Sequence, residues 1–126
     1  MQALLVVAHG SRRAASNQEV FNLIEVLSQK TTDYINISCA FLELATPSIS
    51  DGIDQCVEKG AQELIVLPYF LSAGRHVSED IENALSPKRL EYPQLKITIT
   101  PHIGAAIEMP EMLLNTAKKD KNLWKS

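Results

Sequence analysis

The sequence alternates short apolar runs with amphipathic segments, and this alternation limits the folds open to it more than any other feature. Residues 3–8 and 63–71 are continuous apolar runs, which is typical of strands buried on both faces of a sheet. Residues 34–42 and 95–100 alternate apolar and polar side chains, as strands with one drier face do. The pattern therefore predicts four strands, with those at 3–8 and 63–71 in the centre of the sheet.

Amphipathic segments follow each predicted strand. Apolar side chains that recur every three or four residues predict helices over 14–30, 47–59, 77–85 and 105–118. The second of these is expected to have Thr46 as its N-cap and Pro47 at its first position, and to end at Gly60. Pro87 and Pro93 are expected in the connection that follows the third helix.

Strict alternation of strand and helix predicts an α/β protein, with a parallel sheet and helices on both faces. Right-handed crossovers then give the strand order 2-1-3-4, which is the flavodoxin-like winding. A length of 126 residues fits one domain over 1–126, and the basic end at 118–126 is expected to fray.

The charge balance argues against a general nucleic-acid binder, because a net charge of −3 leaves no broad basic face. No apolar run approaches the length of a membrane span, and no basic segment precedes the first apolar stretch as it would in a signal peptide. Cys39 and Cys56 lack C-x-x-C spacing and are typical of core thiols in a reducing compartment. We therefore expect a cytoplasmic protein without a nucleic-acid or membrane partner.

Four polar residues follow the predicted strands, at the sheet edge where open α/β folds bind ligands. They are His9, Glu43, His76 and His102. His9 follows the first strand, and His76 ends the loop before the helix at 77–85, so the two flank the predicted switch point. Imidazole is the commonest metal ligand and titrates near neutral pH. We therefore expect an open site that binds a divalent ion and accepts protons.

Other interpretations of the same residues stay open. A histidine near a strand end is often only a hydrogen-bonding residue, and His102, beside Pro101, fits a structural role as well as a functional one. The turn at 9–11 could cradle a phosphate, but the glycine-rich nucleotide motifs are absent. Ser11 or Ser72 could act as a nucleophile with a histidine base, although no G-x-S-x-G motif is present.

Three separated segments resemble the signatures of one known family. They are VVAHGSRR at 6–13, FLELATPSI at 41–49 and PYFLSAGRHV at 68–77. These segments are similar to those of the small class II tetrapyrrole chelatases, the sirohydrochlorin cobaltochelatases and ferrochelatases of CbiX type. The resemblance implies a flavodoxin-like fold and a metal chelatase that acts without ATP. The enzyme would insert Co²⁺, with Ni²⁺ or Fe²⁺ as alternatives, into sirohydrochlorin during cobalamin or sirohaem-type biosynthesis, with no cofactor beyond that ion.

The resemblance also implies roles for individual residues. His9 is implied to bind the metal and accept a proton, His76 to bind the metal, and Glu43 to line the tetrapyrrole cleft. The loop implied to lie along the macrocycle consists of Phe70, Leu71, Ser72, Ala73, Gly74 and Arg75. We place Ser11 and Arg12 beside this loop, and infer that Arg12 and Arg75 pair with acid groups of the substrate.

Two other classes of protein remain open at this point. A metal or tetrapyrrole carrier would bind its ligand stoichiometrically without turnover. A phosphoryl-transfer or hydrolytic enzyme would show activity that depends on Ser11. Because longer members of the resembled family fuse two such units, this short chain is expected to act as a symmetric homodimer.

Overall fold

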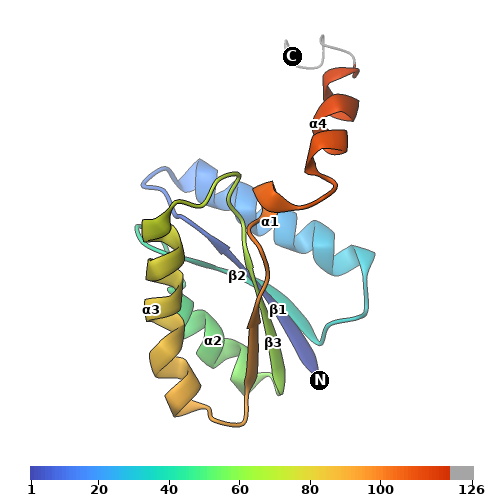
Figure 1. Cartoon of the computed structure of the whole chain (residues 1–126). Coiled ribbons are helices and arrows are strands. Elements are labelled where there is room, and N and C mark those ends of the chain that lie inside the picture. The colour runs from blue at the N-terminus through green and yellow to red at the C-terminus, as the bar shows by residue number, and fades with distance from the viewer. Residues whose placement is uncertain (120–126) are drawn as a thin grey trace.

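In the computed structural model, which describes residues 1–119, a four-stranded parallel sheet forms the centre of the molecule (Figure 1). Its strands are β1 (Gln2–Ala8), β2 (Asn36–Phe41), β3 (Glu63–Pro68) and β4 (Lys96–Ile99). They lie in the order β2-β1-β3-β4, which confirms the predicted winding. The central position of β1 explains its continuous apolar sequence, because it has a neighbour on each side and a helical layer on each face.

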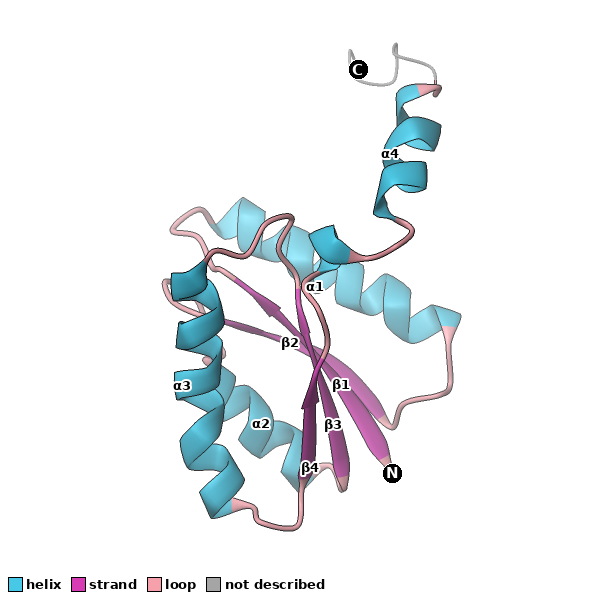
Figure 2. Cartoon of the chain, in the orientation of Figure 1, coloured by secondary structure: helices cyan, strands magenta, loops and turns pink. Residues whose placement is uncertain are grey.

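Helices cover both faces of the sheet (Figure 2). Helix α1 (Ala14–Lys30) packs on one face, whereas α2 (Ile49–Glu58) and α3 (Arg75–Glu91) pack on the other. Alternate residues of β1 supply the two layers, with Val6 facing α1 and Leu5 facing α2. A fully buried side chain such as that of Ile53 contributes about 1.5–3 kcal/mol to stability.

Helix α2 begins later than the sequence predicts. Ser48, and not Thr46, is its N-cap, and the Ser48 hydroxyl accepts a hydrogen bond at 3.1 Å from the backbone N–H three residues later. Pro47 lies before the helix because its carbonyl accepts a hydrogen bond from the Phe41 N–H at 2.9 Å, which holds this segment beside β2. The predicted end is confirmed, since α2 stops two residues before Gly60.

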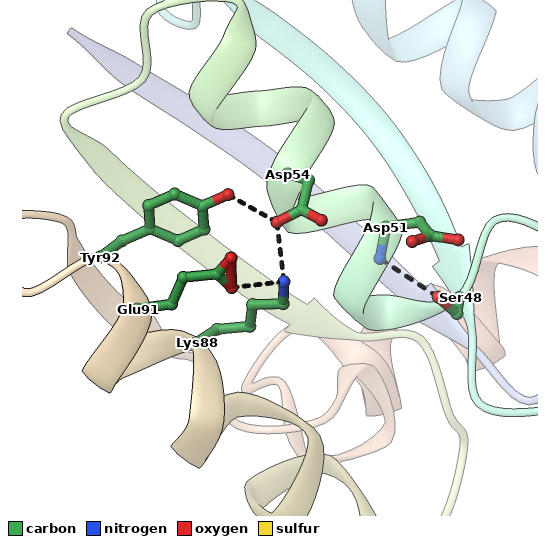
Figure 3. Close-up of polar contacts among 6 residues, drawn as sticks. All are labelled: Ser48, Asp51, Asp54, Lys88, Glu91 and Tyr92. Atoms are coloured by element: carbon green, nitrogen blue, oxygen red, sulfur yellow. Dashed lines mark hydrogen bonds and ion pairs between the residues drawn. The ribbon is translucent and has the colours of Figure 1, made fainter.

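Helix α3 has 17 residues and extends well beyond the predicted range of 77–85. The prediction ended the helix before Pro87, which lacks an N–H and removes one helical hydrogen bond. The next residue, Lys88, compensates by anchoring this turn to α2. Its Nζ donates hydrogen bonds at 2.7 Å to both Asp54 and Glu91 (Figure 3).

This network joins α2 to α3 through groups of opposite charge. Lys88 is only 7% exposed, and the Tyr92 hydroxyl donates a further hydrogen bond to Asp54 at 2.7 Å. Hydrogen bonds from Lys88 and Tyr92 lower the pKa of Asp54, and the same contact with Asp54 raises the pKa of Tyr92 to about 12. Hydrogen bonds to Asp54 and Glu91 raise the pKa of Lys88. The network therefore favours the charged forms of its acid and base.

The segment after β4 contains a short 3-10 helix, η1 (Ile103–Ala105), and α4 (Met109–Ala117), instead of the single helix predicted over 105–118. The Gly104 N–H donates to the Phe70 carbonyl at 2.9 Å, and a Cβ on Gly104 would lie 1.6 Å from the Leu71 carbonyl oxygen. Only glycine therefore lets η1 approach the loop after β3 this closely.

Helix α4 stands away from the sheet (Figure 1). Of its residues only Met109 is buried, and the exposed apolar side chains are those of Met112, Leu113 and Leu114. No helix within residues 1–119 is both long and apolar enough to cross a membrane. Residues 120–126, which include most of the tail that was predicted to fray, lie outside the described part of the chain.

Candidate functional site

The carboxyl ends of β1 and β2 bring His9 and Glu43 together. The Glu43 N–H donates to the His9 carbonyl at 3.1 Å, which extends the pairing of the two strands past their ends. The His9 Nε2 lies 3.4 Å from the Glu43 Oε1. The two side chains are 56% and 60% exposed, so both are open to a ligand while in contact with each other.

Gly10 permits this contact. Its φ of +97° lies in the left-handed region, and a Cβ there would be 1.8 Å from the Glu43 carbonyl oxygen. A side chain at this position would therefore separate the two loops. The turn that carries His9 depends on a glycine to lie against the backbone of the neighbouring loop.

Ser11 shapes the turn between β1 and α1. Its N–H donates to Asn17 Oδ1 at 3.0 Å, and its carbonyl accepts from Asn17 Nδ2 at 2.8 Å. Its hydroxyl accepts from the Arg13 N–H at 3.0 Å. These bonds hold the turn in place, and Arg12 within it is exposed. Ser11 thus has a structural role here that the sequence did not indicate.

A hollow of about 220 Å³ lies beside His9 and Glu43. Its walls come from four segments of the chain and consist of His9, Leu42, Glu43, Ser48, Ile49, Ser50, Asp80 and Ala84. The sequence patterns did not indicate Asp80 as a site residue. It lies four residues after His76 on α3, and this spacing is the signal that could have found it.

His76 does not join this hollow. It is the second residue of α3 and is exposed, so the expectation that it ends a loop before the helix is wrong. The reason is that Gly74 is the N-cap, which starts the helix two residues before the predicted range. Within residues 1–119 no three His, Cys, Asp or Glu side chains converge closely enough to hold a metal ion.

The loop after β3 is longer than predicted because the strand ends at Pro68 and not at residue 71. Phe70 is half-buried against the α2–α3 layer, whereas Leu71 is 76% exposed. Arg75 begins α3 and pairs with Glu79 through a 3.0 Å contact. The remaining loop positions, Ser72, Ala73 and Gly74, are exposed or half-buried. The loop thus presents an apolar and a cationic side chain to solvent.

His102 belongs to a second hollow, of about 250 Å³, between β4 and a different face of α3. Ala73, Ser78 and Glu82 are among the other residues that line it. His102 therefore lines a different hollow from His9, together with Ala73 of the loop that follows β3.

A parallel α/β sheet of order 2-1-3-4 defines a flavodoxin-like protein, and the exposed histidine–carboxylate pair lies at the carboxyl edge, where sheets of this topology bind ligands. The CbiX family model matches residues 3–120, and the chain belongs to this family.

Individual relatives agree with this assignment. The chain is 36% identical over 101 residues to the chloroplastic sirohydrochlorin ferrochelatase of Arabidopsis thaliana, covering 80% of this chain and 44% of that protein. It is 30% identical over 119 residues to the sirohydrochlorin cobaltochelatase of Sulfolobus acidocaldarius, covering 94% of this chain and 92% of that protein. The sirohydrochlorin chelatase SirB of Bacillus subtilis subspecies spizizenii, in complex with cobalt, matches with a TM-score of 0.82 and 30% identity, over 93% of this chain and 50% of that one.

The relatives differ in length from this chain. This chain spans less than half of the length of three curated relatives (44%, 36% and 47%). It spans 92% of the Sulfolobus acidocaldarius cobaltochelatase.

Proposed function

We propose that this chain inserts a divalent metal ion into sirohydrochlorin. The observation that carries the proposal is the exposed His9–Glu43 pair, 3.4 Å apart at the carboxyl ends of β1 and β2. Imidazole and carboxylate both bind first-row divalent ions and both accept protons. A site with two protein ligands holds an ion loosely enough to release it to four pyrrole nitrogens. The names of the relatives support this substrate.

Insertion forms four metal–nitrogen bonds and releases two pyrrole protons. In the proposed reaction His9 accepts one of these protons, and Glu43 stabilises the imidazolium that forms beside it. The second proton passes to solvent water, and His9 then returns its own proton to solvent. Formation of the metal–nitrogen bonds drives the step, so neither ATP nor a redox cofactor enters the proposal.

The loop after β3 is the proposed platform for the macrocycle. Leu71 offers an exposed apolar surface, and Arg12 and Arg75 are exposed cations that can pair with the acid groups of the substrate. We propose His76, which is exposed in the first turn of α3, as a further metal ligand.

The proposed ion is Co²⁺, with Fe²⁺ or Ni²⁺ as alternatives, because histidine and carboxylate ligands suit all three. The relatives include both cobalt and iron enzymes. We further propose that residues 1–126 act as one chelatase unit in the cytoplasm. The two apolar layers share one sheet over the described residues, which supports a single folding unit.

A spectral assay tests the function. Sirohydrochlorin is mixed with each ion in turn, with and without the protein, and loss of the metal-free spectrum is followed. Insertion at many turnovers per chain, faster than the uncatalysed rate, supports the proposal. Binding of one equivalent of ion or tetrapyrrole without turnover would identify a carrier instead.

We also propose that two copies of the chain associate. Helix α4 exposes Met112, Leu113 and Leu114 although it makes little contact with its own sheet. Glu111 lies near one end of the helix and Lys118 at the other. Antiparallel pairing about a twofold axis would bury the apolar side chains and place each Glu111 beside a lysine of the partner.

A further inference from the structure

The hollow beside His9 contains a carboxylate that the predicted metal site did not include. Asp80 lines it together with His9 and Glu43. The side chain of Asp80 has no ion-pair partner among residues 1–119, whereas its neighbour Glu79 is paired with Arg75 at 3.0 Å. Asp80 therefore faces the hollow with its charge uncompensated.

The charges that face this hollow are negative in sum. Glu43 and Asp80 each contribute one negative charge, and no lysine or arginine lines the walls. The N-terminus of α2, which Ser48 caps, supplies roughly half a positive charge, and Asp51 in the first turn already faces it. An excess of roughly one and a half to two negative charges remains when His9 is neutral. Such a field attracts cations and repels carboxylates.

The size of the hollow favours the smaller of the two reactants. Pockets for drug-sized molecules are usually about 300–1,000 Å³, so a hollow of about 220 Å³ is too small to enclose a tetrapyrrole. Six waters around a divalent ion take up roughly 180 Å³, at about 30 Å³ each. The hollow therefore fits a hydrated ion.

We propose that this hollow is the entry site for the divalent metal ion, and that Asp80 attracts the ion into it. The tetrapyrrole, which carries many carboxylates, approaches over the loop that presents Leu71 and Arg75. This inference rests on the proposed function, and it assigns the two substrates to separate surfaces. Because no three ligating side chains converge among residues 1–119, Asp80 acts on the hydrated ion through its waters, and the ion then passes to His9 and Glu43.

The test compares Asp80→Asn with Glu82→Gln, which makes the same charge change two residues away but in the hollow with His102. Asp80→Asn should raise KM for Co²⁺ by about three- to tenfold at low ionic strength. KM for sirohydrochlorin should stay within twofold of wild type. The difference should shrink at about 0.5 M salt, where exposed charges are screened. Glu82→Gln should leave both constants unchanged.

A second measurement separates this inference from the proposed function. Binding of Co²⁺ to the full chain without tetrapyrrole is titrated for wild type and for both variants. Weaker binding in Asp80→Asn alone supports the inference even if wild type inserts no metal, a result that would overturn only the function. Equal Co²⁺ affinity in Asp80→Asn and wild type, or equal losses in both variants, would overturn the role of Asp80.

Discussion

The His9 imidazole lies 3.4 Å from the Glu43 carboxylate because the backbones that carry the two residues are themselves hydrogen-bonded. Within residues 1–119 neither group forms an ion pair with any other side chain, and both are largely exposed. Replacing either side chain should therefore leave the fold intact. Loss of activity in such a variant can be assigned to the missing group.

His9→Ala is expected to lower the rate of Co²⁺ insertion by about 100-fold or more, because a positioned proton acceptor contributes at least that factor. The matched control is His102→Ala, which removes a histidine from the other hollow and should keep the rate within twofold. The measurement is the spectral assay, with circular dichroism to verify folding. Full activity in the folded His9→Ala protein would contradict the assignment.

Gly10→Ala is expected to lower both stability and activity. The new Cβ would lie 1.8 Å from the Glu43 carbonyl oxygen, at a residue whose φ is +97°. We expect a loss of about 2–4 kcal/mol in the free energy of unfolding, measured by urea titration. Gly74→Ala is the control for stability, since no atom lies within 4 Å of the added Cβ, and it should cost less than about 1 kcal/mol. Similar losses in the two variants would contradict the close approach of the loops.

The order of the strands could be predicted because central strands, which are covered on both faces of the sheet, have mostly apolar sequences. The uniformly apolar runs at 3–8 and 63–71 are the central strands β1 and β3. The position of His9 and Glu43 at the same edge of the sheet also followed from this order, because neighbouring parallel strands end at the same edge.

The limits of the helices could not be predicted, because contacts distant in sequence determine them. Pro87 is an ordinary signal for the end of a helix, but Lys88 holds the following turn against Asp54 on α2. His76 lies in α3 and not in the predicted loop, because Gly74 is the N-cap and the sequence gives little sign of this. Asp80 lines the hollow from α3, whose start at Arg75 the sequence did not predict.

The Lys88 network should make stability depend on pH at both ends of the scale. Because the pKa of Asp54 is lowered, Asp54 contributes to folding stability above pH 3.8, its ordinary pKa, and this contribution is lost as the pH falls through the pKa of the folded state. Because the pKa of Tyr92 is raised, Tyr92 contributes to stability below pH 10.0, and this contribution is lost as the pH rises toward 12. The pKa of Lys88 is also raised, so its contribution to stability is lost as the pH rises above 10.5.

Lys88→Met tests this network, because methionine keeps the apolar stem and removes the charge. We expect a loss of about 2 kcal/mol at pH 7, below the roughly 3–5 kcal/mol of a fully buried pair since Asp54 is partly exposed. The free energy of unfolding is measured by urea titration at pH 3, 7 and 11, and the variant should vary less with pH than wild type. Lys59→Met, which removes only a weak 3.4 Å contact with Asn36, should stay within about 0.5 kcal/mol. A Lys88 variant as stable as wild type would contradict the role of the network.

Leu113→Glu tests the proposed pairing of α4. Leu113 is 60% exposed, so the substitution should leave the single chain folded, but it would place a charge in the apolar centre of the helix pair. The mass measured by analytical ultracentrifugation should fall from that of a dimer to that of a single chain. Leu90→Glu is the control, since Leu90 is 85% exposed at the far end of α3 and should not affect association. A wild-type chain that sediments as a monomer, or a dimer that survives Leu113→Glu, would exclude α4 as the interface.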